Sequence, residues 1–121
     1  MRKLLVLEDD ETTRLNLEAY LEEEGFTISS YDEAEAALAA LPTFKPDLCI
    51  VDIRLPAMDG NQFILQSMDV DPNLKFIIYT GYPHYQLSTE LTERGINPKQ
   101  ILHKPLLDMD QMLILIDELI V

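Results

Sequence analysis

The polar side chains that stand out in this sequence lie where short apolar runs end. Three of them are carboxylates, one is a hydroxyl and one is an ammonium group. They are Glu8, Asp9, Asp52, Thr80 and Lys104. This set suits phosphoryl transfer, because an aspartate oxygen can act as the nucleophile while a metal ion, a lysine and a hydroxyl share the phosphoryl charge.

These side chains can act together only if the fold brings the ends of the apolar runs to one place. Five runs are predicted to be strands, and segments with helical spacing alternate with them. Most of the runs are continuously apolar, as in parallel strands that are covered on both faces. The predicted strands are Lys3–Leu7, Phe26–Ser29, Asp47–Val51, Lys75–Tyr79 and Gln100–Leu102.

Start and stop signals mark the helices between these strands. The first is predicted to end at Gly25, and the second to run from an N-cap at Asp32 to Leu41. Two more are predicted at about 61–68 and 84–94. The last begins at an N-cap and carries an apolar stripe that we assign to the core: Asp108, then Met109, Met112, Leu113, Ile116 and Ile120.

Five βα units in 121 residues predict one α/β domain, residues 1–121. We expect a flavodoxin-like, doubly wound five-stranded parallel sheet of order 2-1-3-4-5, with helices on both faces. Ligands of such sheets bind beyond the carboxyl ends of the strands. The first and third strands are neighbours in this order, so Glu8, Asp9 and Asp52 should converge on one crevice.

Three carboxylates in one crevice repel one another. At about 4 Å and an effective dielectric near 20, each pair costs roughly 4 kcal/mol. A cation between them removes this cost, and oxygen ligands favour Mg²⁺ with some retained waters. The repulsion also predicts a raised pKa for at least one of the three carboxyl groups.

Four stretches, LEDD, VDIRLPAMDG, IIYTG and LHKP, agree in order and spacing with a known family. Through them the chain resembles the receiver (REC) domain of bacterial two-component response regulators over essentially its whole length. The resemblance implies a signalling module that takes a phosphoryl group from a histidine kinase or phosphotransfer protein and relays its state to an output domain or target protein. It is not expected to be an enzyme beyond its own phosphorylation and dephosphorylation.

The resemblance implies a role for each residue of the predicted site. Asp52 would be the phosphoacceptor, Asp9 a direct Mg²⁺ ligand, and Glu8 a ligand acting largely through water. Thr80 would bind the phosphoryl group through its hydroxyl, and Lys104 would be the counter-ion.

The resemblance extends to the residues around the site. The backbone carbonyl of Arg54 would be a further metal ligand, and Pro56 and Gly60 match the family's loop after the phosphoacceptor. The Lys104–Pro105 peptide is implied to be cis. Ile101 departs from the family, whose members usually carry Tyr or Phe there as a switch. Since isoleucine has no ring to turn, we expect the signal to pass into the loop 81–85 and the fourth helix.

Other residues near the site are assigned lesser roles. Asp10, Glu11 and Asp59 are interpreted as exposed loop or cap charges, and His84 and His103 lack placed partners. The exception is the pair Arg54 and Tyr82. These two residues flank the crevice, and we expect them to tune the lifetime of a phosphoryl group by gating water.

Two other functions use related chemistry or the same fold. A haloacid-dehalogenase-like Mg²⁺-dependent phosphatase also uses an aspartate nucleophile, but it needs a second aspartate two residues later, where this chain has Arg54. A flavin-binding module would need a phosphate loop rich in Ser, Thr and Gly after the first strand. This chain has LEDDETT there, whose carboxylates would repel a phosphate.

Composition excludes further classes. A net charge of −13 argues against direct nucleic-acid binding. The apolar run near the N-terminus is too short for a secretory signal or a membrane span. The single cysteine, Cys49, is interpreted as a buried packing residue in a reducing compartment, so a cytoplasmic location is expected. No effector domain is recognised, and the chain is expected to be either a stand-alone receiver or part of a longer regulator.

Overall fold

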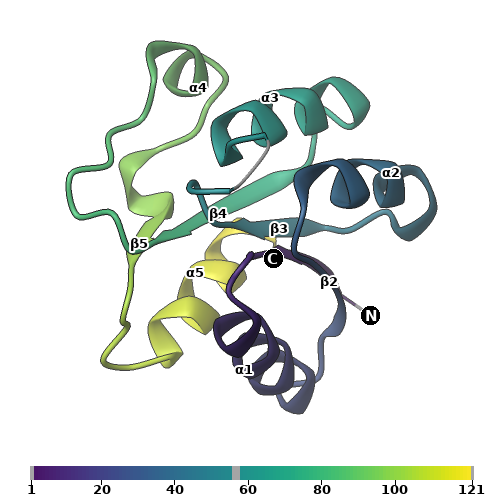
Figure 1. The fold of residues 1–121 in the computed structure, drawn as a ribbon, viewed down its shortest axis with the longest axis vertical. Helices are drawn as coiled ribbons and strands as arrows, with labels where there is room; N and C mark the ends of the chain where they lie inside the picture. The colour runs from purple at the N-terminus through teal and green to yellow at the C-terminus, as the bar shows by residue number, and fades with distance from the viewer. Residues whose placement is uncertain (1, 56–57, 121) are drawn as a thin grey trace.

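The computed structural model describes residues 2–55 and 58–120. Within these residues, five parallel strands form one sheet of order β2-β1-β3-β4-β5 (Figure 1). The predicted fold class and strand order are therefore confirmed. The strands are β1 (Lys3–Leu7), β2 (Thr27–Tyr31), β3 (Leu48–Val51), β4 (Lys75–Thr80) and β5 (Ile101–His103).

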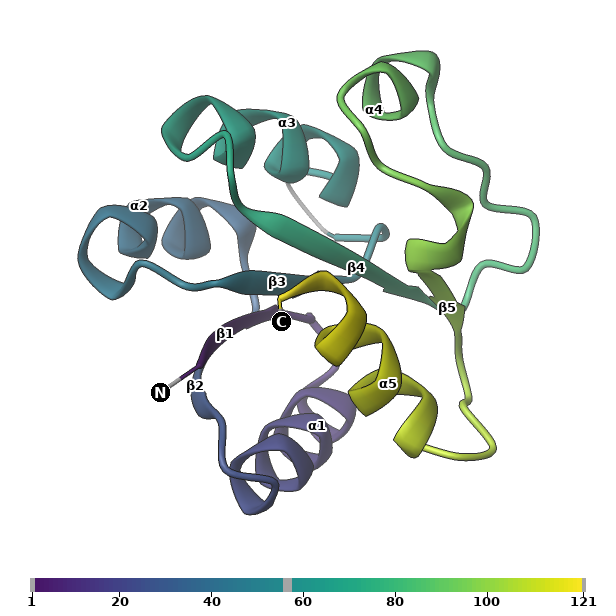
Figure 2. The same ribbon diagram turned by 180° about the vertical axis from the view of Figure 1, so that it is seen from behind.

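Helices cover both faces of the sheet. The helices α2 (Ala34–Phe44), α3 (Gly60–Val70) and α4 (Thr89–Glu93) lie on one side, and α1 (Glu11–Glu23) and α5 (Asp110–Leu119) lie on the other (Figures 1 and 2). A short 3₁₀ helix, Pro98–Gln100, precedes β5. None of the helices formed by the described residues has the length and apolar character needed to span a membrane.

Alternate side chains of the strands build a separate core on each face. In β1, Leu5 and Leu7 pack in the cluster formed with α2 and α3, whereas Leu4 and Val6 pack in the cluster formed with α1 and α5. Cys49 in β3 is fully buried, as predicted, and burial raises the pKa of its thiol above the ordinary value. The buried strands thus hold their carboxyl ends firmly at one edge of the sheet.

The predicted bounds of α2 were wrong at both ends. The first helical hydrogen bond is accepted by the carbonyl of Glu33, so Glu33 and not Asp32 is the N-cap. The helix continues past Pro42 to Phe44 and ends where Lys45 takes a left-handed φ of 52°. Proline is tolerated here because it removes only one backbone donor, close to the end of the helix.

The fourth helix is much shorter than the predicted 84–94. It begins only after Ser88, whose hydroxyl accepts from the Leu91 backbone N–H at 3.1 Å and so caps the helix. The last helix also starts later than predicted, because the Asp108 side chain accepts from the Asp110 N–H in a local turn. Residues 81–88 are therefore an irregular segment between β4 and α4.

Gly60, the first residue of α3, lies against the backbone that leads out of β3. A Cβ atom at this position would lie 2.5 Å from the carbonyl oxygen of Asp52 and 2.8 Å from Cα of Ile53. The Gly60 N–H also donates to the Ile53 carbonyl at 2.9 Å. Only glycine allows this approach, which fixes the start of α3 beside the end of β3.

Gly60→Ala should lower the free energy of unfolding by about 1–3 kcal/mol, since backbone atoms must move to admit the methyl group. Urea unfolding followed by circular dichroism measures the change. Gly81→Ala is the matched control, because a Cβ atom there meets nothing within 4 Å. Equal midpoints for Gly60→Ala and the wild type would contradict the close approach.

Candidate functional site

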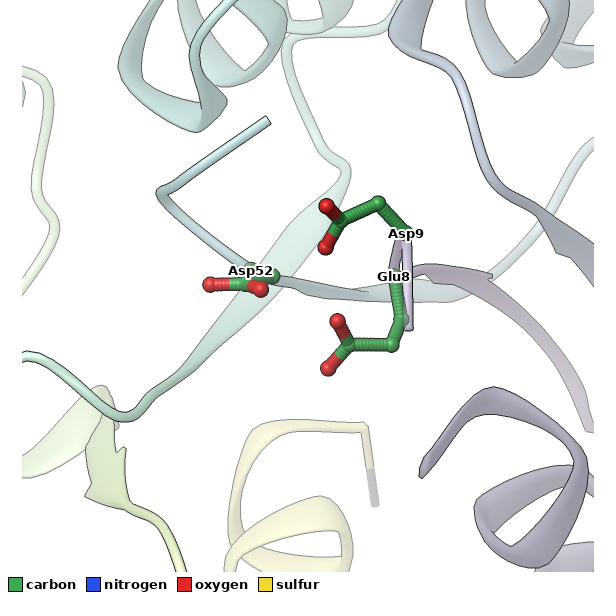
Figure 3. A group of neighbouring side chains, drawn as sticks. All are labelled: Glu8, Asp9 and Asp52. Carbon is green, nitrogen blue, oxygen red and sulfur yellow. The ribbon is translucent and has the colours of Figure 1, made fainter. Parts of the chain in front are cut away.

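The pairing of β1 with β3 brings three carboxylates together. Leu7 pairs with Val51, so the residues that come after each strand lie side by side. The Asp52 N–H donates to the Leu7 carbonyl at 2.9 Å and extends this pairing by one residue. One oxygen from each of Glu8, Asp9 and Asp52 lies within 4.8 Å of the others. Figure 3 shows Glu8 and Asp9 extending from the end of β1 on the side where Asp52 lies.

These carboxylates differ in exposure. Glu8 is 2% exposed and Asp52 is 7% exposed, whereas Asp9 lies at the surface. Burial raises the pKa of Glu8 to about 7, and the neighbouring Asp52 adds to this while Lys104 opposes it. The predicted raised pKa is therefore confirmed, but desolvation and not repulsion is its larger cause.

Lys104 supplies a positive charge to this cluster from the end of β5. Its backbone N–H donates to the Thr80 carbonyl at 2.8 Å, and its peptide bond to Pro105 is cis, as predicted. Its ammonium group donates to Asp52 Oδ2 at 3.3 Å and forms an ion pair with Glu8. Burial disfavours the charged ammonium, but the hydrogen bonds and charges of Glu8 and Asp52 together outweigh burial and raise the pKa of Lys104.

Thr80 and Arg54 approach the site from two neighbouring segments. The Thr80 side chain is fully buried, and its hydroxyl accepts from the Tyr82 N–H at 3.1 Å. The Arg54 N–H donates to Asp52 Oδ1 at 3.2 Å, and the Arg54 guanidinium lies over the Tyr82 ring, 4.3 Å from its centre. The predicted water gating by Arg54 and Tyr82 stays a prediction.

These contacts do not test two further predictions, which concern the Arg54 backbone carbonyl and Pro56. Within residues 2–55 and 58–120, no hydrogen bond to the Arg54 backbone carbonyl is seen, so its role as a metal ligand stays a prediction. Pro56 lies outside the described residues. The histidines are exposed, with His84 in the segment after β4 and His103 in β5.

Sequence reasoning did not find the contacts that hold the Glu8 backbone. The Arg14 guanidinium donates to the Glu8 carbonyl at 3.0 Å, and the Glu8 N–H donates to the Tyr31 carbonyl at 3.0 Å. Asp10, interpreted above as a loop or cap charge, is the N-cap of α1 and accepts from the Thr13 N–H at 2.9 Å. The sequence did contain a signal for the Arg14 contact. Arg14 lies six residues after Glu8, in the first turn of the predicted helix, where its side chain can reach back to the end of the strand.

The donor set fits a hard divalent cation. All three side chains offer carboxylate oxygens, the ligands that Mg²⁺ and Ca²⁺ prefer. Within the described residues, Lys104 forms ion pairs with Glu8 and Asp52, and Asp9 adds a third carboxylate to the same cluster. Burial is the main cause of the raised pKa of Glu8, and the neighbouring Asp52 adds to it, so a cation beside these two groups would relieve an unfavourable charge. These residues therefore suit a bound metal ion.

The raised pKa of Glu8 sets a pH dependence of stability in protein stripped of divalent cations with EDTA. Folded protein holds the Glu8 proton more tightly than unfolded protein, so ionisation of Glu8 between pH 4.5 and about 7 costs folding free energy. A shift of this size corresponds to at most about 3 kcal/mol. The stability gained by Glu8→Gln should therefore grow as pH rises through this window and level off above it.

Urea unfolding of the wild type and of Glu8→Gln checks this, measured at pH values about one unit apart between about 4 and 8. Glu11→Gln, a change of the same kind on an exposed side chain in the first turn of α1, is the control and should track the wild type. A stability difference between Glu8→Gln and wild type that is flat with pH would count against the buried, ionisable Glu8.

The chain is similar to known regulators in sequence. The response regulator receiver domain family matches residues 4–117. The chain is 33% identical over 92 residues to the C4-dicarboxylate transport transcriptional regulatory protein DctD of Rhizobium meliloti, covering 76% of this chain and 20% of DctD. It is 30% identical over 90 residues to the response regulator receiver protein CpdR of Brucella abortus, covering 74% of this chain and 75% of CpdR. It therefore spans only about a fifth of the length of DctD.

The fold is similar to that of a solved receiver, the response regulator protein TrrA of Thermotoga maritima. The complex of TrrA with Mg²⁺ and BeF matches with a TM-score of 0.85 and 26% identity, over 98% of this chain and 99% of TrrA. TrrA in complex with the histidine kinase ThkA matches with a TM-score of 0.85 and 25% identity, over 100% of each chain. These comparisons do not support the haloacid-dehalogenase alternative. The family match, the strand order and the carboxylates at the strand ends agree, and the chain belongs to the response regulator receiver domain family.

Proposed function

We propose that residues 1–121 act as one receiver domain in which Asp52 accepts a phosphoryl group and the surface relays its presence. The observation that carries this proposal is the position of Asp52. Its carboxylate lies at the end of β3, 3.3 Å from the Lys104 ammonium and within 4.8 Å of carboxylate oxygens of Glu8 and Asp9. Phosphoryl transfer to a carboxylate requires a nucleophilic oxygen with positive charges beside it, and here Lys104 and a metal ion bound by the carboxylates would supply those charges.

In the proposed reaction, a carboxylate oxygen of Asp52 attacks phosphorus and forms a new P–O bond. The bond from phosphorus to the donor breaks, and the leaving group departs with the electron pair. Lys104 stays charged, because its pKa is raised, and it faces the negative charge that collects on the phosphoryl oxygens. The buried Thr80 hydroxyl, at the end of the neighbouring strand, can donate to one of those oxygens.

We propose that Mg²⁺ is the metal held by this site. Asp9 and Asp52 would bind it directly, Glu8 through water, and the Arg54 backbone carbonyl would add a ligand. When bound, the ion shares the charge of the phosphoryl oxygens and of the three carboxylates. The oxygen donor set supports this assignment, as does the similarity to TrrA, which was solved with Mg²⁺ and BeF.

The phosphoryl donor is proposed to be a sensor histidine kinase or a phosphotransfer protein. Support comes from the similarity to TrrA, which was solved in complex with the histidine kinase ThkA. The receiver is not proposed to catalyse reactions of other substrates, and its output would be a further domain or a target protein. We propose a cytoplasmic location, in keeping with its single, fully buried cysteine.

Asp52→Asn should abolish the phosphoryl adduct that forms when the protein is treated with acetyl phosphate and Mg²⁺, because the amide is not a nucleophile of comparable strength. Intact-mass spectrometry detects the adduct. Asp59→Asn is the matched control: Asp59 caps α3 through its side chain, a role that asparagine also fills, and the adduct should persist. An undiminished adduct on Asp52→Asn would contradict the assignment of Asp52 as the phosphoacceptor.

Asp9→Asn should weaken Mg²⁺ binding by at least about tenfold, since it removes a charged ligand. Isothermal titration of Mg²⁺ into EDTA-treated protein measures the affinity. The control Asp10→Asn removes the same charge one residue away, where the side chain caps α1, and should change the affinity much less. Equal losses in both variants would show that the affinity depends on general charge and not on a ligand at Asp9.

A further inference from the structure

The irregular segment between β4 and α4, residues 81–88, is tied to α3 by a side-chain hydrogen bond. The Tyr85 hydroxyl donates to Asn61 Oδ1 at 2.6 Å, between residues 24 positions apart. The Tyr85 ring is half-buried against the core cluster on the face covered by α2 and α3. Burial raises the pKa of its hydroxyl to about 12, so the group stays protonated and remains a donor.

The Asn61 end of this bond cannot move easily. Asn61 is the second residue of α3 and directly follows Gly60. Gly60 is pressed against the backbone of Asp52 and Ile53, where even a methyl group would lie 2.5 Å from the Asp52 carbonyl oxygen. By contrast, the Arg54 guanidinium that lies over Tyr82 is on a long, exposed side chain, which can follow a moving ring.

The Tyr85 end is connected to Thr80. The Tyr82 N–H donates to the Thr80 hydroxyl at 3.1 Å, and the Tyr85 N–H donates to the Tyr82 carbonyl at 3.3 Å, which closes a turn. Contacts therefore run from the Thr80 side chain through this turn to the Tyr85 ring. If the Thr80 hydroxyl moves, either the Tyr82 N–H loses its partner or the turn moves with it.

A phosphoryl group on Asp52 would pull on this connection. It would offer charged oxygens to the Thr80 hydroxyl, and hydrogen bonds to a charged acceptor are roughly twice as strong as neutral ones. The hydrogen bond from Thr80 to the phosphoryl group would draw the turn at Tyr82 with it. This movement would strain the hydrogen bond between the uncharged side chains of Tyr85 and Asn61, because Asn61 is fixed at the start of α3. We propose that the Tyr85–Asn61 hydrogen bond is a latch that holds the segment 81–88 against α3, and that phosphorylation of Asp52 works against this latch. The inference rests on the proposed phosphorylation of Asp52.

The test uses beryllofluoride, which mimics a phosphoryl group on a carboxylate, with saturating Mg²⁺. Tyr85→Phe removes the hydroxyl and keeps the ring, so it opens the latch without emptying the core. It should bind beryllofluoride more tightly than the wild type by about 2- to 10-fold, the factor that a neutral hydrogen bond provides. In NMR spectra without beryllofluoride, the amide signals of residues 82 and 84–88 should shift part of the way toward their bound positions.

Two further variants show whether the effect belongs to this bond. Asn61→Ala removes the acceptor and should give the same gain, and the double variant should add little to either single change. Tyr20→Phe is the matched control: it loses a hydrogen bond to Asp110 on the opposite face of the sheet, 3.0 Å long, and should bind beryllofluoride as the wild type does.

The outcomes separate the latch from the function on which it rests. Failure of the wild type to bind beryllofluoride would overturn both the proposed phosphorylation and the latch. Wild-type binding with no gain in Tyr85→Phe, or with an equal gain in Tyr20→Phe, would overturn the latch alone. Additive gains in the double variant would do the same, because the two side chains would then act independently.

Discussion

Three like charges held at one edge of a sheet are the constraint around which the rest of this structure is arranged. Glu8 and Asp52 are almost fully buried, and they share one ammonium group, that of Lys104. Repulsion among the three carboxylates opposes this placement, and the single ammonium group of Lys104 cannot balance all three negative charges. Their positions are instead set by the backbone, through the pairing of Asp52 with Leu7 and of Glu8 with Tyr31. The sheet therefore supplies the free energy that keeps the charges together.

The fold separates a rigid part from a part that can change position. The cores on the two faces of the sheet fix the ends of β1 and β3 and the start of α3, and the close approach of Gly60 leaves no room for adjustment there. The segment 81–88 has no regular secondary structure, and α4 after it spans only Thr89–Glu93. Such a segment has few backbone hydrogen bonds of its own, so small differences in side-chain contacts can decide its position.

The sequence was sufficient for the strand order and for the gathering of Glu8, Asp9, Asp52 and Lys104 at one edge of the sheet. Both depend on buried parallel strands and on the polar residues directly after their carboxyl ends. It was insufficient for helix ends, where neighbouring residues compete to cap. Asp32 has a good capping side chain, yet the first helical bond falls at Glu33. Ser88 caps α4 late and leaves the preceding residues outside the helix. A contact between distant residues, such as that of Tyr85 with Asn61, leaves no periodic pattern in the sequence.

The burial of Cys49 has a practical consequence. It is the single cysteine of the chain, and it lies in β3 between two other strands with its thiol fully covered. A thiol reagent can reach it only when β3 separates from its neighbours or from the helices above it, and burial further suppresses the reactive thiolate. The rate of alkylation under native conditions therefore reports how often the sheet opens far enough to expose this thiol. Because the chain has a single cysteine, all of the alkylation measured comes from Cys49.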